Sequence, residues 1–491
     1  MMAKLLCEKI MRRLIPLFAA WFFLIGATCA KDVRPPAVAG AFYPADPEVL
    51  KMTVDGYVSA APKEKVPGRL AVLVAPHAGY EYSGGVAGRA FRQIQGEQYD
   101  TVIILGPTHY YPFRGVSVYT GGSFITPLGE VRVDQEMARS LLDEKKDIKC
   151  DLNAHVKEHS IEVELPFLQR TLKDFRIVPI VVGDYSRDAF DELGSKISSL
   201  LTSGKKKILV VVSTDWSHYH DYDTAVRMDT LGISSVEDLS SFELINRARM
   251  GDIELCGIFP MTVALDAANK AGIDTARLFE YKNSGDVTGK HDNVVGYAAM
   301  GFYKSNSSDS PPVLSRKDKS ELVKIGRDTL EEFVNTGKEP SAKPDNPALA
   351  RPGACFVTLK EKGELRGCIG NFIGEGPLYQ AVRDMAVNAC SRDSRFMPVA
   401  KEELKDIKLE ISVLSPLRKP RSVDDIKVGR DGLYIMKGGY SGVLLPQVPV
   451  EYGWDRDTFL AQTCRKAGLP PDAWKDGADI YVFTADVFGE E

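Results

Sequence analysis

Short apolar runs recur through the first 300 residues, and most of them stop at a glycine, a proline or a polar residue. Four of these runs are rich in β-branched residues and have the length expected of buried parallel strands. They cover residues 70–75, 101–105, 177–182 and 208–212. A fifth strand is expected at residues 294–302.

Amphipathic helices are predicted between these strands. Residues 184–201, for example, place Leu193 and Ile197 on one helical face. Repeated alternation of strand and helix is typical of a central sheet that is covered by helices. The pattern therefore predicts an α/β first domain, residues 33–304, built on a central and mostly parallel sheet.

The alternation breaks at residues 305–312, a run of serine, aspartate and proline. Such a run cannot bury a core and predicts an exposed linker, which we place at residues 305–314. A smaller α+β domain is expected over residues 315–491, opening with an amphipathic helix at 317–334. Its later strands are expected at 354–360, 408–414 and 441–445, and its later helices at 376–389 and 455–467.

The N-terminus has the three parts of an export signal. Arg12 and Arg13 precede an apolar stretch at 14–27, and small residues follow up to Ala30. We expect residues 1–30 to be a signal peptide cleaved after Ala30, or a membrane anchor if it is retained. The protein is then exported and periplasmic or membrane-anchored, and it is cytoplasmic if the segment is not a signal.

Charge and cysteine content narrow the classes of partner. A net charge of −5 gives no electrostatic reason to expect nucleic acid, and membrane contact is expected only through the N-terminal segment. None of the eight cysteines forms a CxxC pair, which argues against a zinc ribbon or a thioredoxin-like motif.

All seven histidines lie between His77 and His291. Imidazole is a neutral metal ligand and a proton carrier near pH 7, so one half of the chain is expected to hold a site. His77, His109 and His218 each follow a predicted strand closely, and ligands bind at the carboxyl ends of such strands. We therefore expect these histidines to converge. Two others are expected in exposed loops: His155 and His220.

Two imidazoles and one anionic ligand suit a divalent metal that keeps positions open for substrate or oxygen. His77 and His109 supply the imidazoles. The residues alone leave Cys256, Glu158 and Asp215 as alternatives for the third ligand, and a buried, inert thiol is a further interpretation of Cys256. Three residues are candidates for orienting or acid–base groups: His159, Asp215 and His218.

A second candidate site lies in the second domain, around Cys368 between two glycines. Arg366 beside a thiol favours its ionised, nucleophilic form, whereas the alternative is a cysteine buried at a strand edge. Arg395, with Asp393, would bind an anion or form a structural ion pair. Since this domain has no histidine, a Cys–His mechanism from its own residues is excluded. The candidates are Arg366, Cys368 and Arg395.

The first domain resembles the Memo family. The motifs PHAGYEYSG, LGPTHYYP, EHSIEVELPFL and STDWSHY occur in the family's order, followed by Cys256-Gly257. The family is similar to class III extradiol dioxygenases, which use non-haem iron in a related α/β fold. The resemblance implies a metal site at His77, His109 and Cys256, with Asp215 and His218 nearby. A thiolate replaces the carboxylate of the dioxygenases, so the resemblance implies a metal site more firmly than a reaction.

The second domain resembles the AMMECR family through LRGCIG, SRDSRFMPV, ISVLSPL and LLPQV. This resemblance implies a two-part α+β fold. Bacteria often encode the two families together with a radical S-adenosylmethionine protein, a grouping that resembles a three-part modification system. The chain lacks the CxxxCxxC spacing of radical enzymes, so that partner is expected to be a separate protein.

Together these features predict a metal-binding redox protein or oxygenase-like component of such a system. The expected metal is divalent, Fe(II) first, with zinc and copper as alternatives. The expected substrate is a small molecule or a protein residue. Two other functions stay open: a metal-dependent hydrolase with His159 or His218 as base, and a non-catalytic protein that binds a peptide or a metal.

Overall fold

The computed structural model describes residues 33–304, 314–340, 343–346, 348–374, 376–420 and 422–490. The expected signal segment, residues 1–30, and residues 305–313 of the expected linker lie outside the described residues. Within the described ranges, every helix is too short or too polar to cross a membrane.

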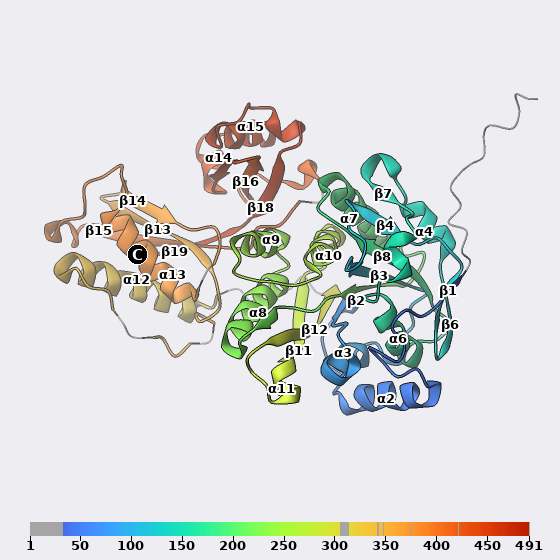
Figure 1. The fold of residues 1–491 in the computed structure, drawn as a ribbon. Coiled ribbons are helices and arrows are strands. Elements are labelled where there is room, and N and C mark those ends of the chain that lie inside the picture. The colour runs from blue at the N-terminus through green and yellow to red at the C-terminus, as the bar shows by residue number, and fades with distance from the viewer. Residues whose placement is uncertain are drawn as a thin grey trace, which may run out of the picture.

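One large sheet forms the centre of the first domain (Figure 1). Its central strands are β2 (Arg69–Ala75), β9 (Ile208–Ser213), β3 (Thr101–Pro107) and β8 (Arg176–Val182). These four strands lie in that order and are parallel, as predicted. Every residue of β3 is buried, which explains its continuous apolar run.

Antiparallel strands extend the sheet on both sides. Strand β12 (Val294–Lys304) pairs with β2, and β4 (Val116–Val118) pairs with β8. The outer strands are β10 (His218–His220), β11 (Thr275–Asn283) and β7 (Ile148–Lys149). A separate small sheet contains β1 (Val33–Arg34), β5 (Ser123–Thr126) and β6 (Gly129–Arg132).

Helices cover both faces of this sheet (Figure 1). On one face α7 (Arg187–Thr202) packs against α10 (Ile258–Ala271). On the other, α3 (Tyr80–Arg92) packs against α2 (Pro47–Ala60) and α6 (Leu165–Thr171). The remaining helices are α4 (Gln135–Leu141), α5 (Asn153–Val156), α8 (Tyr222–Glu237), α9 (Ser241–Met250) and α11 (Ser284–Thr288).

A pair of glycines allows α2 and α3 to approach closely. Gly84 and Gly88 of α3 face Tyr57 of α2, and a Cβ atom at either glycine would lie 2.4–2.7 Å from Tyr57. That distance is far below a van der Waals contact, so any larger residue would push α2 away. This packing holds α3, which begins at Tyr80 shortly after His77, against α2.

The second domain has two parts, as its family resemblance implies. In the first, α12 (Arg316–Thr336) and α13 (Leu378–Ser391) cover the sheet β14-β13-β15-β19. In the second, α15 (Arg456–Lys466) packs against the sheet β17-β16-β18. The other bounds are β13 Ala354–Glu361, β14 Glu364–Gly370, β15 Ile407–Leu414, β16 Gly432–Lys437, β17 Tyr440–Leu444, α14 Gln447–Glu451, β18 Asp479–Phe483 and β19 Ala485–Gly489.

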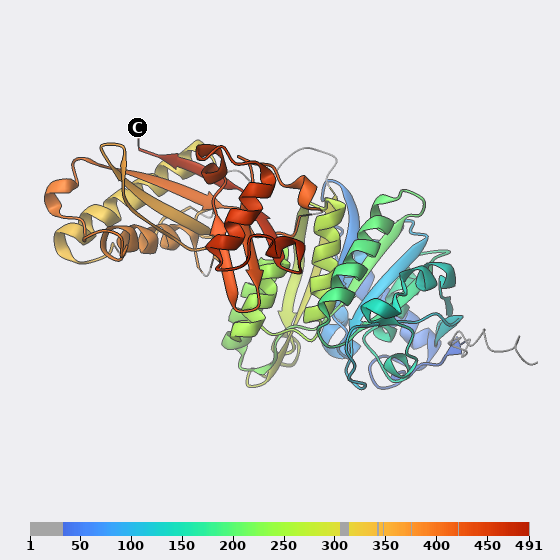
Figure 2. The same ribbon diagram turned by 90° about the horizontal axis from the view of Figure 1, so that it is seen from above.

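The two domains share a packed interface, and Figure 2 shows them side by side. Phe242 of α9 contacts the ring of Tyr481 of β18 with a centroid distance of 4.7 Å. Lys419 reaches from the second domain to Asp191 of α7 at 2.7 Å and to Asp266 of α10 at 3.4 Å. An aromatic contact and a mostly buried cation therefore connect the two domains.

The expected fold class is confirmed. The first domain is α/β with a central sheet flanked by helices, and the smaller second domain mixes strands and helices. The helix expected at 184–201 spans Arg187–Thr202, and the helix expected at 317–334 spans Arg316–Thr336.

Candidate metal centre

Three neighbouring parallel strands bring candidate residues to one edge of the sheet. His77 follows the end of β2, and His109 follows the end of β3. Strand β9 lies between β2 and β3 and ends at Ser213, so Asp215 enters the same edge. This is the carboxyl edge at which α/β sheets bind ligands, as the sequence predicts.

His77, His109 and His159 form the histidine cluster. Each offers a ring nitrogen, and the three atoms lie within 4.8 Å of one another. The ring centroids are 5.2 Å apart for His77 and His109, and 4.5 Å apart for His109 and His159. His77 and His159 are buried, whereas His109 is partly exposed and opens the cluster to solvent. Three converging nitrogens can hold a divalent ion.

A buried carboxylate orients His109. Nδ1 of His109 donates to Oε1 of Glu158 at 2.8 Å, and the backbone N–H of His109 donates to Oε2 at 2.7 Å. Two further N–H groups, of His159 and Ser160, donate to Oε1 at 2.9 Å. Burial alone raises the pKa of Glu158, but the hydrogen bonds, led by that from His109, lower it to about 2. Glu158 therefore stays ionised and leaves Nε2 of His109 available to a metal.

The buried histidines are neutral. Burial lowers the pKa of His77 to about 3, and the repulsion that a proton on His109 would cause lowers it further. Burial also lowers the pKa of His159 to about 4, and the repulsion that a proton on His77 would cause is the second contribution. A neutral imidazole has a free lone pair, so both residues are ready to bind a metal at physiological pH.

Cys256 lies beside the histidine cluster, next to His77. Its Sγ atom is 3.4 Å from Nε2 of His77 and accepts the backbone N–H of Asp215 at 3.2 Å. Burial raises the pKa of the thiol, and the charge of Asp215 raises it further. The predicted ligand set and the histidine cluster thus share His77 and His109. That Cys256 and not His159 is the third metal ligand stays a prediction.

Asp215 and His218 surround His77. Oδ1 of Asp215 accepts the backbone N–H of His77 at 2.9 Å, and its Oδ2 lies 3.9 Å from Nε2 of His77. Burial raises the pKa of Asp215. His218 begins β10 and is partly exposed, with Nδ1 3.9 Å from Glu254. Asp215 therefore supports His77. His218 lies on the solvent side of the site.

The loop that carries His159 is anchored by the start of the first domain. The Arg34 guanidinium pairs with Glu162 at 2.5 Å and donates to the backbone carbonyls of His155 and Glu158. His155 is buried rather than exposed, so the expectation of an exposed loop was wrong for this residue. Its burial lowers the pKa of His155 to about 3 and makes it part of the packing that holds the loop.

In the second domain, the two candidate arginines are paired with carboxylates. Arg366 forms a bidentate pair with Glu403 at 2.7 and 3.1 Å, and Arg395 pairs with Asp393 at 2.7 Å. Asp393 also accepts the backbone N–H of Cys368, whose Sγ atom lies 3.1 Å from Oγ1 of Thr358 across the β13–β14 ladder. The structure thus brings Arg395 to Cys368, while the described contacts of Arg366 are with Glu403 and with nearby carbonyl groups.

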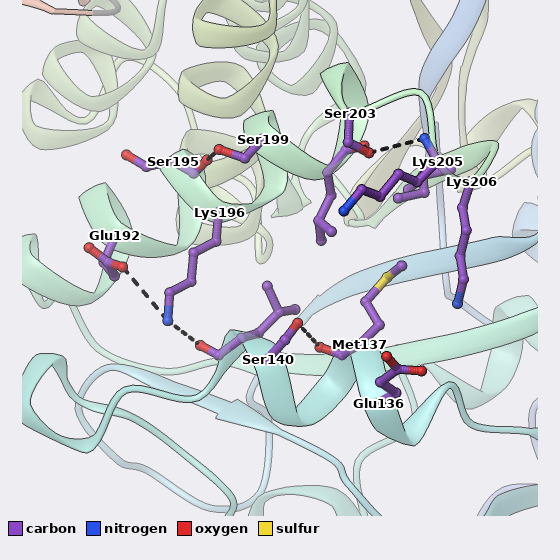
Figure 3. Close-up of a pocket in the computed structure, with 13 residues that line it drawn as sticks. Glu136, Met137, Ser140, Glu192, Ser195, Lys196, Ser199, Ser203, Lys205 and Lys206 are labelled. Carbon is purple, nitrogen blue, oxygen red and sulfur yellow. Dashed lines mark hydrogen bonds and ion pairs between the residues drawn. The ribbon is translucent and has the colours of Figure 1, made fainter.

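A cavity of about 650 Å³ lies at the opposite edge of the sheet, near Ile208 at the start of β9 (Figure 3). Several of its polar groups already have partners within the protein. Lys196 donates to the carbonyl of Leu141, and the hydroxyls of Ser195 and Ser199 donate to carbonyls of their own helix. This cavity is therefore separate from the metal centre, and its lining lacks the convergence seen at the histidine cluster.

Two residues that connect to His77 were not predicted: Ser213, whose Oγ lies 2.8 Å from Nδ1 of His77, and Glu164, whose Oε1 lies 2.7 Å from that Oγ. Ser213 ends a strand, and Glu164 stands among apolar residues in Val163-Glu164-Leu165. A carboxyl group within an apolar run is the signal that could have identified Glu164 as a buried polar partner.

Comparison with known proteins adds an independent observation. The family model described as Memo-like protein matches residues 34–301, more than half of the chain. The chain belongs to the Memo family. The AMMECR1 family model matches residues 323–488, so an AMMECR1 domain follows the Memo domain.

Curated relatives match the Memo domain over their whole length. A MEMO1 family protein of Aquifex aeolicus is 39% identical over 271 residues, which is 55% of this chain and 99% of that protein. MEMO1 family protein PAE0818 of Pyrobaculum aerophilum is 37% identical over 279 residues, again 55% and 99%. Among solved structures, the uncharacterized protein PH0010 from Pyrococcus horikoshii is 44% identical over 36% of this chain and 94% of that chain, with a TM-score of 0.35.

Proposed function

We propose that the Memo domain binds a divalent metal at the histidine cluster, with iron as the first candidate. In this proposal the domain acts as a redox component, and its substrate is a small molecule or a protein residue. The observation that carries this proposal is the convergence of three ring nitrogens within 4.8 Å at the carboxyl edge of the sheet. The AMMECR1 domain would bind or present the substrate.

The donor set fits a divalent metal. Nδ1 of His159 is buried and has no hydrogen-bond partner in the described part of the chain. A buried polar atom without a partner costs about 1–3 kcal/mol, and an ion nearby is one way to offset that cost. The neutral state of His77 and His159 supports the same conclusion, because protonated imidazoles cannot bind a cation.

A metal bound at this cluster supplies Lewis acidity and, in the case of iron, redox chemistry. The chain's own residues position the ligands. Glu158 directs Nε2 of His109 toward the cluster, and Asp215 holds the backbone of His77. His218, partly exposed beside Asp215, is the group placed to accept or deliver a proton at the open side.

Two further parts of the proposal concern the setting of the protein. We propose that it works with a separate radical S-adenosylmethionine protein, and that residues 1–30 direct its export. The first part is supported by the fusion of a Memo and an AMMECR1 domain, and the second by the three-part N-terminus. Co-purification and N-terminal sequencing of the mature protein test them.

Metal analysis of protein purified without added metal tests the main proposal. We expect about one divalent ion per chain in the wild type and little in His77→Ala and His109→Ala. His220→Ala is the matched control, because His220 pairs with Glu254 outside the cluster and should leave metal content unchanged. Wild-type metal content in the His77 and His109 variants would refute the site.

A further inference from the structure

The Oγ atom of Ser213, the last residue of β9, has three hydrogen-bond partners. It lies 2.8 Å from Nδ1 of His77, 2.6 Å from the carbonyl oxygen of Ser160 and 2.7 Å from Oε1 of Glu164. Ser213 and Glu164 are both completely buried. With no solvent around them, these groups must satisfy one another.

Counting hydrogens decides the direction of each bond. A serine hydroxyl has one hydrogen to donate and two lone pairs that accept. The carbonyl of Ser160 can only accept, so the hydrogen of Ser213 points to it. The two other contacts must then be donated to Ser213, one by Nδ1–H of His77 and one by the carboxyl O–H of Glu164.

We propose that Glu164 is a neutral carboxylic acid that, through Ser213, fixes His77 with its hydrogen on Nδ1 and its lone pair on Nε2. Glu164 is then a positioning residue for the metal centre, and this role rests on the proposed function. If Glu164 were ionised, it would take the hydrogen of Ser213, and two lone pairs would face each other at 2.6 Å between Ser213 and Ser160.

The surroundings of Glu164 favour the neutral form. Its second oxygen, Oε2, is buried and has no hydrogen-bond partner in the described part of the chain. The neighbouring charge is that of Asp215, which has the same sign as an ionised Glu164, and burial raises the pKa of Glu164 well above its usual range. An ionised Glu164 would leave an unpaired charge in this buried site, which costs far more than a neutral acid whose second oxygen has no hydrogen bond.

His109 and His77 are therefore oriented by different kinds of hydrogen-bond partner. Glu158 accepts four N–H hydrogen bonds as a carboxylate and supports His109 with a negative charge. Ser213 and Glu164 support His77 with a neutral pair. Both arrangements direct Nε2 toward the cluster, but only one adds a charge to it.

Infrared difference spectroscopy tests the protonation of Glu164 without any metal. The metal-free wild type at pH 7 should show the C=O band of a neutral carboxylic acid that is absent from Glu164→Gln. Glu81→Gln, at an exposed site of α3, is the control and should keep the band. A wild-type spectrum without this difference would overturn the proposal, and it would do so whether or not the protein binds metal.

Metal affinity tests the positioning role. Titration with Co²⁺ should give Glu164→Gln an affinity close to wild type, because its amide N–H still donates to Ser213. Ser213→Ala and Glu164→Leu should weaken binding by about 10- to 100-fold. Wild-type affinity in both of these variants would overturn the positioning role. No Co²⁺ binding by the wild type would instead refute the proposed metal site, so the two failures are distinguishable.

Discussion

In the first domain three imidazoles converge on one another at the carboxyl edge of a sheet, whereas in the second domain each guanidinium of the Cys368 region faces a carboxylate. The imidazoles leave ring nitrogens available, and their buried partners serve to direct those nitrogens. Arg366 and Arg395 use their donors on Glu403 and Asp393. The histidine cluster has lone pairs that are free to bind a ligand. The arginine–carboxylate pairs already neutralise each other, and such pairs stabilise the local structure.

The largest test of this comparison asks whether the two regions can be separated. Lys419→Met removes a cation that is shared by Asp191 and Asp266 across the domain interface. Asp266 is buried and loses its cation, whereas Asp191 is partly exposed and keeps its pair with Arg187, so the interface should weaken by about 3 kcal/mol, mostly through Asp266. After proteolytic cleavage within residues 305–312, the wild-type fragments should elute together in size-exclusion chromatography, and the Lys419→Met fragments should separate.

The metal should stay with the Memo fragment after that separation, because the AMMECR1 fragment has no histidine. Metal retained by the AMMECR1 fragment would overturn the division of roles between the domains. Lys205→Met, at an exposed site away from the interface, is the matched control.

A second test compares the two carboxylates. Glu158→Gln should lower the free energy of unfolding at pH 7 by about 3 kcal/mol, because folding lowers the pKa of Glu158 from its usual 4.5 to about 2. That stability is present above pH 4.5 and is lost as the pH falls toward 2. Urea unfolding across this range should therefore show an acid loss in the wild type that Glu158→Gln lacks.

Glu403→Gln provides the contrast in the second domain. Its pair with Arg366 is partly exposed, so the loss should stay below about 1 kcal/mol. Equal losses at Glu158 and Glu403 would contradict the difference drawn between the two clusters.

The third test asks whether the thiol beside His77 binds the metal. Burial raises the pKa of Cys256, so the thiol is protonated at pH 7.5–9 and must lose its proton to become a ligand. If Cys256 binds, metal affinity should rise by about tenfold per pH unit over this window. A flat profile, matched by Cys256→Ser, would assign the third position to His159.

The smallest expected effect belongs to Cys368. Cys368→Ser keeps a hydroxyl near Oγ1 of Thr358 and leaves the pairs of Arg366 and Arg395 intact. We expect a stability change below about 1 kcal/mol and unchanged metal content. A change in metal content would show that the two regions are coupled across the interface.

Much of this architecture could be predicted because buried parallel strands are continuous apolar runs. The four central strands, and the convergence of His77 and His109 at their carboxyl ends, follow from that pattern alone. The place of His159 could not be predicted in the same way, because it lies in a loop whose position depends on Arg34 and Glu162. His155 shows the same limit, since its burial depends on packing between segments distant in sequence.

The contact of Arg34 with the loop that carries His159 also bears on when the metal is acquired. Arg34 and the residues it binds are separated by up to 128 positions in the chain. Contacts between such distant segments form late, after the intervening strands have paired. A growing or unfolded chain therefore lacks the complete histidine cluster. The protein would take its ion from the compartment in which it finishes folding, so the metal supply of that compartment would decide which ion it carries.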